Sequence, residues 1–288
     1  MPGKNFSGHT KGILCIILAA LGFSLMSFFV RLAGDLPTME KAFFRNLVAL
    51  FVALFVLIGN RDSLAVPKGA GRPLFFRCLF GSTAIIANFY AIDRIGLADS
   101  NMLNKLSPFF AIIVSIPLLK EKPSFFDIIS TVIAFIGALL IIRPTASFTF
   151  IPALIGLYGG FGAGTAYSFV RLLGKKNVKS TIIIFYFSTF SCLITLPFLI
   201  FDFVPMTWPQ FLCLIAAGVS AALGQFGITN AYKFAPAKDI SVFDYTQVIF
   251  AALWAFIFFG EIPVFLSVIG YILIIGIAVV RWLGHKKE

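Results

Sequence analysis

The stretch "ADSNMLNKLSPFFAIIVSIPLL", from Ala98 to Leu119, carries a lysine near the middle of an apolar segment that is long enough to cross a bilayer. Asn104 directly precedes Lys105, and Pro108 follows within one helical turn. A charged side chain at the centre of a bilayer costs roughly 2.5–3.5 kcal/mol on insertion scales, so such residues usually face a wet cavity and carry function. We therefore expect Lys105 to contact a negatively charged group.

Arg45 is a second cation at a comparable depth. With a rise of about 1.5 Å per residue, Lys105 lies about 10 Å from the start of its segment, and Arg45 is equally deep when counted from Thr38. Arginine grips a carboxylate through two hydrogen bonds, and lysine supplies a compact charge. The pair predicts an anion site, unless the side chains extend along their stems to the interface. Arg77 lies near a segment end, and we expect its side chain to extend to the interface and contact lipid.

Asp244, in "ISVFDYTQV", is the one acid well inside a predicted segment. Because burial disfavours the charged form of a carboxyl, Asp244 could carry a coupling proton, or it could form part of an inner gate. The alternative is a hydrogen bond that closes a helix N-terminus. Straight helices would separate Lys105 and Asp244 by about 14 Å in depth, so we expect no permanent ion pair between them.

Neutral polar residues inside the segments complete the candidate substrate site. Those that we expect to contact a solute are Asn88, Tyr90, Asn104, Gln225, Asn230, Tyr245 and Gln247. Glu121 and Glu261 each lie at a segment end and precede a proline within two residues, so we expect them to stabilise the start of the following helix.

The chain shows no pattern of a cofactor site, a metal site or an enzyme. A Gly-rich phosphate loop, an HExxH motif and a CxxC motif are all missing, and the two histidines lie in the polar tails. Cys15, Cys78, Cys192 and Cys213 are isolated in apolar segments, where they are expected to be small core residues. We therefore expect no cofactor, no metal and no catalytic residues.

The composition is that of an all-α membrane protein. Of 288 residues, 59% are hydrophobic and only 12% are charged, and the mean hydropathy is +0.98. A soluble domain must carry more charge on its surface. The net charge of +11 comes mostly from basic residues between apolar runs, so it indicates topology signals beside anionic lipids rather than nucleic-acid binding.

Ten segments are long and apolar enough to be membrane spans. Their approximate bounds are 12–31, 38–59, 73–93, 98–119, 124–143, 151–171, 180–202, 208–232, 240–260 and 262–283. With this count both termini share one side, and among the basic residues between segments only Arg31, Lys41, Arg94 and Arg143 fall on the other side. The positive-inside rule then predicts that both termini are cytoplasmic, in a plasma-membrane protein.

The chain repeats itself at an offset of 140 residues. "GFSLMSFFVRLAG" from Gly22 matches "GAGTAYSFVRLLG" from Gly162, and the same offset takes Asp99 to Asp239 and Glu121 to Glu261. We expect two five-helix repeats, at residues 1–143 and 151–288. Because five is odd, the second repeat must be inverted, an arrangement typical of secondary transporters with a substrate site between the halves.

Two such repeats, each with a glutamate before its fifth segment, resemble the drug/metabolite transporter superfamily, specifically its EamA-type members. "FFRNL", "NKLSPFFAIIVS" and "YTQVIFAALWAFIFFGE" are similar to that pattern. The resemblance implies that the first four segments of each repeat line a central cavity and that the fifth segments are peripheral. It leaves open amino acids, sugars, nucleotides, choline and organic acids as substrates.

The sequence therefore predicts a secondary transporter that moves a small organic anion or zwitterion by alternating access. Arg45 and Lys105 would hold the negative group. The alternative is an exporter of amino acids or of aromatic or cationic metabolites, which would use a Phe-rich cavity wall and Asp244.

Overall fold

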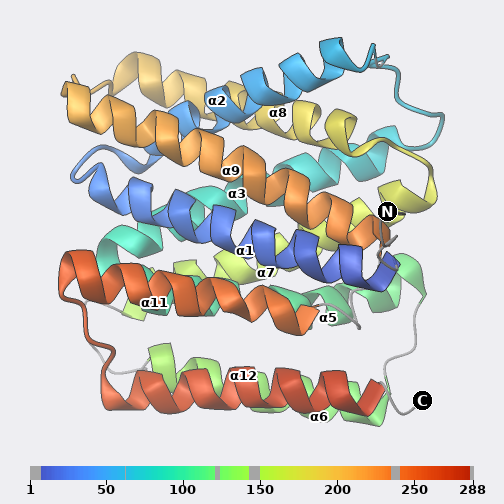
Figure 1. Cartoon of the computed structure of the whole chain (residues 1–288), viewed down its shortest axis with the longest axis vertical. Coiled ribbons are helices and arrows are strands. Elements are labelled where there is room, and N and C mark those ends of the chain that lie inside the picture. The colour runs from blue at the N-terminus through green and yellow to red at the C-terminus, as the bar shows by residue number, and fades with distance from the viewer. Residues whose placement is uncertain (1–7, 62, 121–123, 143–149, 235–240, 286–288) are drawn as a thin grey trace, which may run out of the picture.

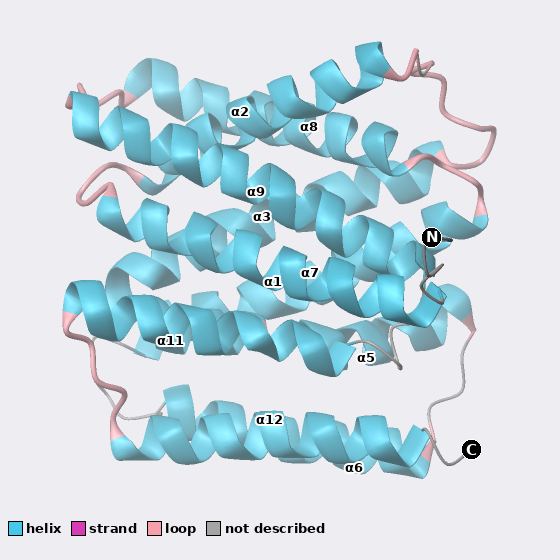
Figure 2. Cartoon of the chain, viewed as in Figure 1, coloured by secondary structure: helices cyan, strands magenta, loops and turns pink. Residues whose placement is uncertain are grey.

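The computed structural model describes residues 8–61, 63–120, 124–142, 150–234 and 241–285. Within these ranges every regular element is a helix (Figure 2). The first half contains α1 (Gly8–Leu32), α2 (Thr38–Gly59), α3 (Gly71–Ile95), α4 (Leu97–Asn104), α5 (Ser107–Leu119) and α6 (Phe125–Ile142). The second half contains α7 (Phe150–Lys175), α8 (Ser180–Phe201), α9 (Trp208–Phe234), the 3-10 helix η1 (Ser241–Tyr245), α11 (Thr246–Phe259) and α12 (Phe265–His285).

These helices form the ten predicted segments, because α4 with α5 and η1 with α11 each make up one broken segment. Six segments of the described chain are long and apolar enough by themselves to cross a membrane. Large apolar side chains cover the outside of the bundle; Phe55 is 80% exposed and Phe201 is 85% exposed. Such a surface suits lipid rather than water, and the protein is a multi-pass membrane protein.

The fourth segment breaks beside Lys105. Pro108, in the first turn of α5, has no backbone N–H to donate to a carbonyl of the preceding turn. The N–H of Lys105 is shared between the carbonyls of Asn101 and Met102, which tightens the end of α4. The ninth segment changes from a 3-10 helix to an α-helix between Tyr245 and Thr246. Tyr245 corresponds to Lys105 under the 140-residue offset, so both segments break at equivalent positions. The region around Lys105 is thus a break between two helices.

The packing partners exchange under the same offset. Helix α1 packs on α9, and their counterparts α7 and α3 also pack on each other. Helices α2 and α8, which are counterparts, pack together, as do α6 and α12. In Figure 1, α6 and α12 lie side by side along one edge of the molecule. The fifth segment of each half is therefore peripheral, as the family resemblance implies.

Glycines let α7 approach the broken segment closely. A Cβ atom on Gly160 would lie 2.6 Å from the carbonyl oxygen of Leu103, and one on Gly164 would lie 2.4 Å from that of Ser107. Both distances are too short for real atoms, so only glycine fits at these positions. Gly160 and Gly164, four residues apart on α7, therefore allow close backbone packing beside Lys105.

Ion pairs tie the helices together at the end of the bundle where α1 ends. Arg31 Nη2 lies 3.3 Å from Glu261 Oε1, and Lys41 Nζ lies 2.8 Å from Asp93 Oδ2. The other carboxylate oxygen of Glu261 accepts the backbone N–H of Leu97 at 3.0 Å. The prediction that Glu261 stabilises the helix following it was wrong, since it stabilises the start of α4 instead. Glu121 lies outside the described residues.

Candidate functional site

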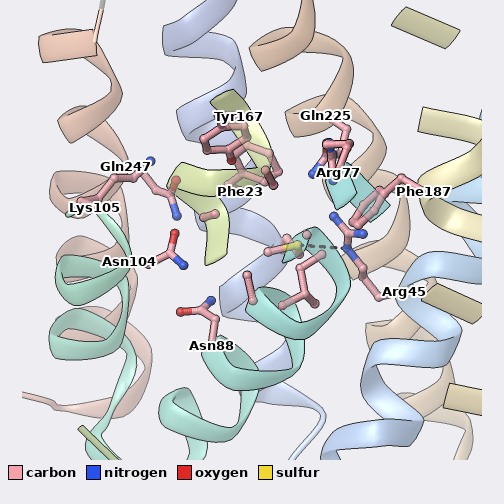
Figure 3. A pocket seen from close by; sticks show the side chains of 16 residues that line it. Phe23, Arg45, Arg77, Asn88, Asn104, Lys105, Tyr167, Phe187, Gln225 and Gln247 are labelled. Atoms are coloured by element: carbon pink, nitrogen blue, oxygen red, sulfur yellow. Dashed lines mark hydrogen bonds between the residues drawn. The ribbon is translucent and has the colours of Figure 1, made fainter. Parts of the chain in front are cut away.

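A cavity of about 60 Å³ lies inside the bundle, with room for several water molecules. Its wall is built by α1, α2, α3, α4, α7, α8, α9 and α11, together with Lys105 at the segment break (Figure 3). The first four segments of each half thus contribute to one cavity, in agreement with the family resemblance. Polar side chains from both halves meet in this cavity.

Arg45 reaches the cavity from α2 and is completely buried. Its Nη1 donates a hydrogen bond to Asn46 Oδ1, and its Nε approaches Met26 Sδ at 3.3 Å. Asn46 is held in turn by Ser191 Oγ, 2.7 Å from its Nδ2. The remaining terminal nitrogen, Nη2, has no hydrogen-bond partner among the described residues. Arg45 is therefore fixed in position, and the N–H groups of Nη2 are still available.

Arg77 reaches the same cavity from α3 and is only 2% exposed. Its Nη2 donates to Gln225 Oε1 at 3.1 Å, and its Nε has no partner among the described residues. A Cβ on Gly81 would lie 2.1 Å from Arg77 Nη1, so glycine makes room for the guanidinium. The prediction that Arg77 extends to the interface was wrong, because the side chain turns inward against Phe187.

The two guanidinium groups share one aromatic ring. Arg77 Cζ lies 4.1 Å from the centroid of Phe187, and Arg45 Cζ lies 5.9 Å from it. Neither arginine takes part in an ion pair in the described chain. Burying charge without a counter-ion is costly, and cation–π contacts offset only part of this cost. This end of the cavity therefore favours an anion that accepts the free N–H groups.

Lys105 and Asp244 form an ion pair, whereas the sequence predicts no permanent pair between them. Lys105 Nζ lies 2.6 Å from Asp244 Oδ2, and both side chains are almost fully buried. The depth estimate assumed straight, unbroken helices. Both segments break here, and the long lysine stem adds its own reach. Arg45 and Lys105 line the same cavity, but Figure 3 places Arg45 beside Arg77, across the cavity from Lys105.

The neutral candidates divide into two groups. Asn88, Asn104, Gln225 and Gln247 line the cavity. The other three lie elsewhere: Tyr90 stacks under Arg94 at 5.6 Å, Asn230 Oδ1 accepts from Ser180 Oγ at 3.5 Å, and Tyr245 packs in an apolar cluster with residues such as Leu106 and Ala138. Phe187 was missed, because nothing marks one phenylalanine among 36.

The comparisons with known proteins agree with this architecture. The model of the EamA-like transporter family matches residues 10–143 and again residues 150–282. One solved crystal structure has the same fold, with a TM-score of 0.73 at 16% identity over 96% of this chain and 98% of that one.

Three relatives carry names that describe transport. The pseudopaline exporter CntI of Pseudomonas aeruginosa (strain UCBPP-PA14) is 31% identical over 269 residues, covering 92% of this chain and 93% of the relative. Human solute carrier family 35 member G1 is 29% identical over 295 residues, with coverage of 96% and 81%. A riboflavin transporter of Vibrio cholerae is 27% identical over 263 residues, with coverage of 88% and 86%.

The doubled family match, the relatives and the cavity between the two halves support one conclusion. The chain belongs to the EamA-like transporter family of the drug/metabolite transporter superfamily, and it is a membrane transporter rather than an enzyme.

Proposed function

We propose that this protein is a secondary transporter of small organic anions or zwitterions, and that Arg45 and Arg77 hold the negative group of the solute. The observation that supports this most strongly is the pair of buried guanidinium groups with free N–H donors and no carboxylate partner in the described chain. Hydrogen bonds between a guanidinium and an oxyanion are charge-assisted and strong. A bound anion would remove the cost of two buried like charges.

Transport proceeds by alternating access in this proposal, with two inverted repeats at residues 1–143 and 151–288. The exchange of α1–α9 and α3–α7 contacts under the 140-residue offset is what a two-fold relation between repeats would produce. The cavity is too small for a solute much larger than a few water molecules, so the lining helices must separate to admit one. The ion pairs of Arg31 and Lys41 would close one end.

The ion pair between Lys105 and Asp244 would act in gating or coupling. It joins the two broken segments, so any movement of one half against the other must stretch or break it. Asp244 Oδ1 has no partner in the described chain, which leaves an acceptor for a proton. Protonation would release Lys105 and loosen the connection between the halves. A proton is therefore the coupling ion that we propose.

The location that we propose is the plasma membrane, with both termini in the cytoplasm. The start of α1 and the end of α12 lie on the same side of the bundle in Figure 1, as ten crossings require. The bias of lysine and arginine then assigns this side to the cytoplasm.

The second candidate function is export of amino acids or of aromatic or cationic metabolites. Phe23 and Phe187 in the cavity wall favour a flat apolar group. A cation site at Asp244 is less well supported, because Lys105 already neutralises that carboxylate.

A ligand screen followed by counterflow tests the proposal. Purified protein is screened by thermal shift against carboxylates, phosphates, amino acids and quaternary amines, and each stabilising solute is then tested, radiolabelled, in liposomes. We expect stabilisation by anions or zwitterions, and accumulation of label against unlabelled internal solute. Stabilisation by quaternary amines alone would overturn the anion assignment, and binding without counterflow would overturn the carrier mechanism.

A further inference from the structure

The cavity has two chemically different ends. Arg45 and Arg77 lie at one end, and Asn104 and Gln247 lie across the cavity from them beside Lys105 (Figure 3). Asn88 adds a third amide to the wall near Asn104. A solute that spans the cavity therefore meets guanidinium groups at one end and side-chain amides at the other.

The amide end carries no net charge. Lys105 is the only cation among the residues that line this end in the described chain, and its ammonium group lies 2.6 Å from Asp244 Oδ2. The two charges of the buried pair cancel. A second anionic group on the solute would have to compete with Asp244 for Lys105, and it would lie close to the carboxylate that it displaces. The arginine end, by contrast, retains both of its positive charges.

The amides themselves have unused hydrogen-bonding groups. The Asn104 amide makes no hydrogen bond to another described residue. Gln247 Nε2 donates to Asn101 Oδ1 at 2.8 Å, which leaves Gln247 Oε1 as an acceptor. Asn88 Oδ1 accepts from Ser100 Oγ at 3.1 Å, which leaves Asn88 Nδ2 as a donor. This end thus offers donors and acceptors together, the pattern that an uncharged amide or hydroxyl group can satisfy.

We propose that the protein selects organic acids that carry a negative charge at one end and a neutral hydrogen-bonding group at the other. This inference rests on the proposed anion site at Arg45 and Arg77. A second carboxylate at the far end is rejected by Asp244. An apolar far end is rejected because it would leave buried amide groups without partners, and sites built from hydrogen-bonding groups discriminate strongly against analogues that lack them.

Matched ligands separate these alternatives. Calorimetry on the purified full-length protein compares glutarate, its monoamide glutaramate, and pentanoate, which differ only at one end. The corresponding four-carbon and six-carbon series vary the distance between the two ends of the solute. At the best chain length we expect the monoamide to bind at least about tenfold more tightly than either the dicarboxylate or the alkyl acid, as one buried hydrogen bond implies.

Two variants locate the discrimination. Asn104→Leu should reduce the preference for glutaramate over pentanoate, whereas Asn60→Leu, on the exposed end of α2, should leave it unchanged. Asp244→Asn should free the charge of Lys105 and shift the preference toward glutarate. The direction of this second shift distinguishes an electrostatic effect from a loss of folding, which would weaken all three ligands equally.

The outcomes distinguish this inference from the proposed function. If the acids bind and Arg77→Gln weakens all of them, but glutarate binds best or pentanoate matches glutaramate, the selectivity proposal is wrong and the anion site stands. If the acids bind and Arg77→Gln changes none of their affinities, the anion site itself is wrong. No binding by any of the nine acids would overturn the selectivity proposal, while the wider screen would still test the anion site.

Discussion

Lys105 and Asp244 join the two halves of the chain at the point where both of their segments break, with 2.6 Å between Nζ and Oδ2. The pair is almost fully buried, so each charge depends on the other for its stability. Lys105 also lines the cavity that holds Arg45 and Arg77. Breaking it should therefore affect both the stability of the fold and the movement between conformations.

A double-mutant cycle measures how much the interaction between Lys105 and Asp244 contributes to the free energy of unfolding. Lys105→Met or Asp244→Leu alone should destabilise the protein by about 3–5 kcal/mol, because each leaves an uncompensated buried charge. The double variant should recover most of the loss, since well-packed apolar residues often replace a buried pair at little cost. Unfolding in detergent is the measurement, with Lys68→Met on an exposed loop as the control. Additive losses in the double variant would contradict the pairing.

Gly81 should control the position of Arg77. A Cβ at this position overlaps Arg77 Nη1 and lies 2.9 Å from Phe187 Cε2. Gly81→Ala should push the guanidinium out of place and weaken anion binding by at least about tenfold, or about 1.4 kcal/mol. Gly71→Ala on the same helix meets open space and is the matched control. Equal affinities in the two variants would show that the position of Arg77 does not matter for binding.

Close packing of α7 should be essential for the broken segment. Gly164→Ala should cost about 1–3 kcal/mol, the usual range for overpacking, because the added methyl group meets the carbonyl of Ser107. Gly174→Ala near the end of the same helix meets nothing within 4 Å and should have little effect. Thermal unfolding of both variants tests this, and a neutral Gly164→Ala would mean that the two helices are not in contact in the native protein.

Glu261 should hold the start of α4 in place. It accepts the N–H of Leu97 and pairs with Arg31, so Glu261→Gln weakens both contacts. We expect faster hydrogen exchange of the backbone amides in α4, measured by mass spectrometry. Asp202→Asn, at the exposed end of α8, is the control. Unchanged exchange in α4 would exclude Glu261 as part of a closure at this end of the bundle.

Much of the fold could be predicted from the sequence because its signals are local. Apolar length located the ten segments, and the 140-residue offset takes Lys105 to Tyr245, where the structure breaks the ninth segment. The spacing of Gly160 and Gly164 on α7 is likewise local, and both residues lie against backbone carbonyls. These features depend on the thickness of the bilayer and on contacts between residues close in the sequence, so they are visible as sequence patterns.

The arrangement of charges could not be predicted because it depends on tilt and on breaks. Counting residues from segment ends placed Lys105 far from Asp244 and beside Arg45, whereas the structure pairs Lys105 with Asp244 and Arg45 with Arg77. A side chain near a helix end can turn inward as well as outward. For Arg77 the deciding factors are Gln225, Phe187 and the space over Gly81. Gly81 is one helical turn away in the sequence, but Gln225 and Phe187 are distant in it.

The central claim is that Arg45 and Arg77 together hold the negative group of the solute. Calorimetry with the tightest anion from the ligand screen tests it most directly. Arg45→Gln and Arg77→Gln should each weaken binding by about 2–5 kcal/mol, as expected for truncating one side of a buried charged contact. The double variant should lose less than the sum, because both residues share one partner. Arg94→Gln, on α3 outside the cavity, should bind normally. Full affinity in both single variants would contradict the account.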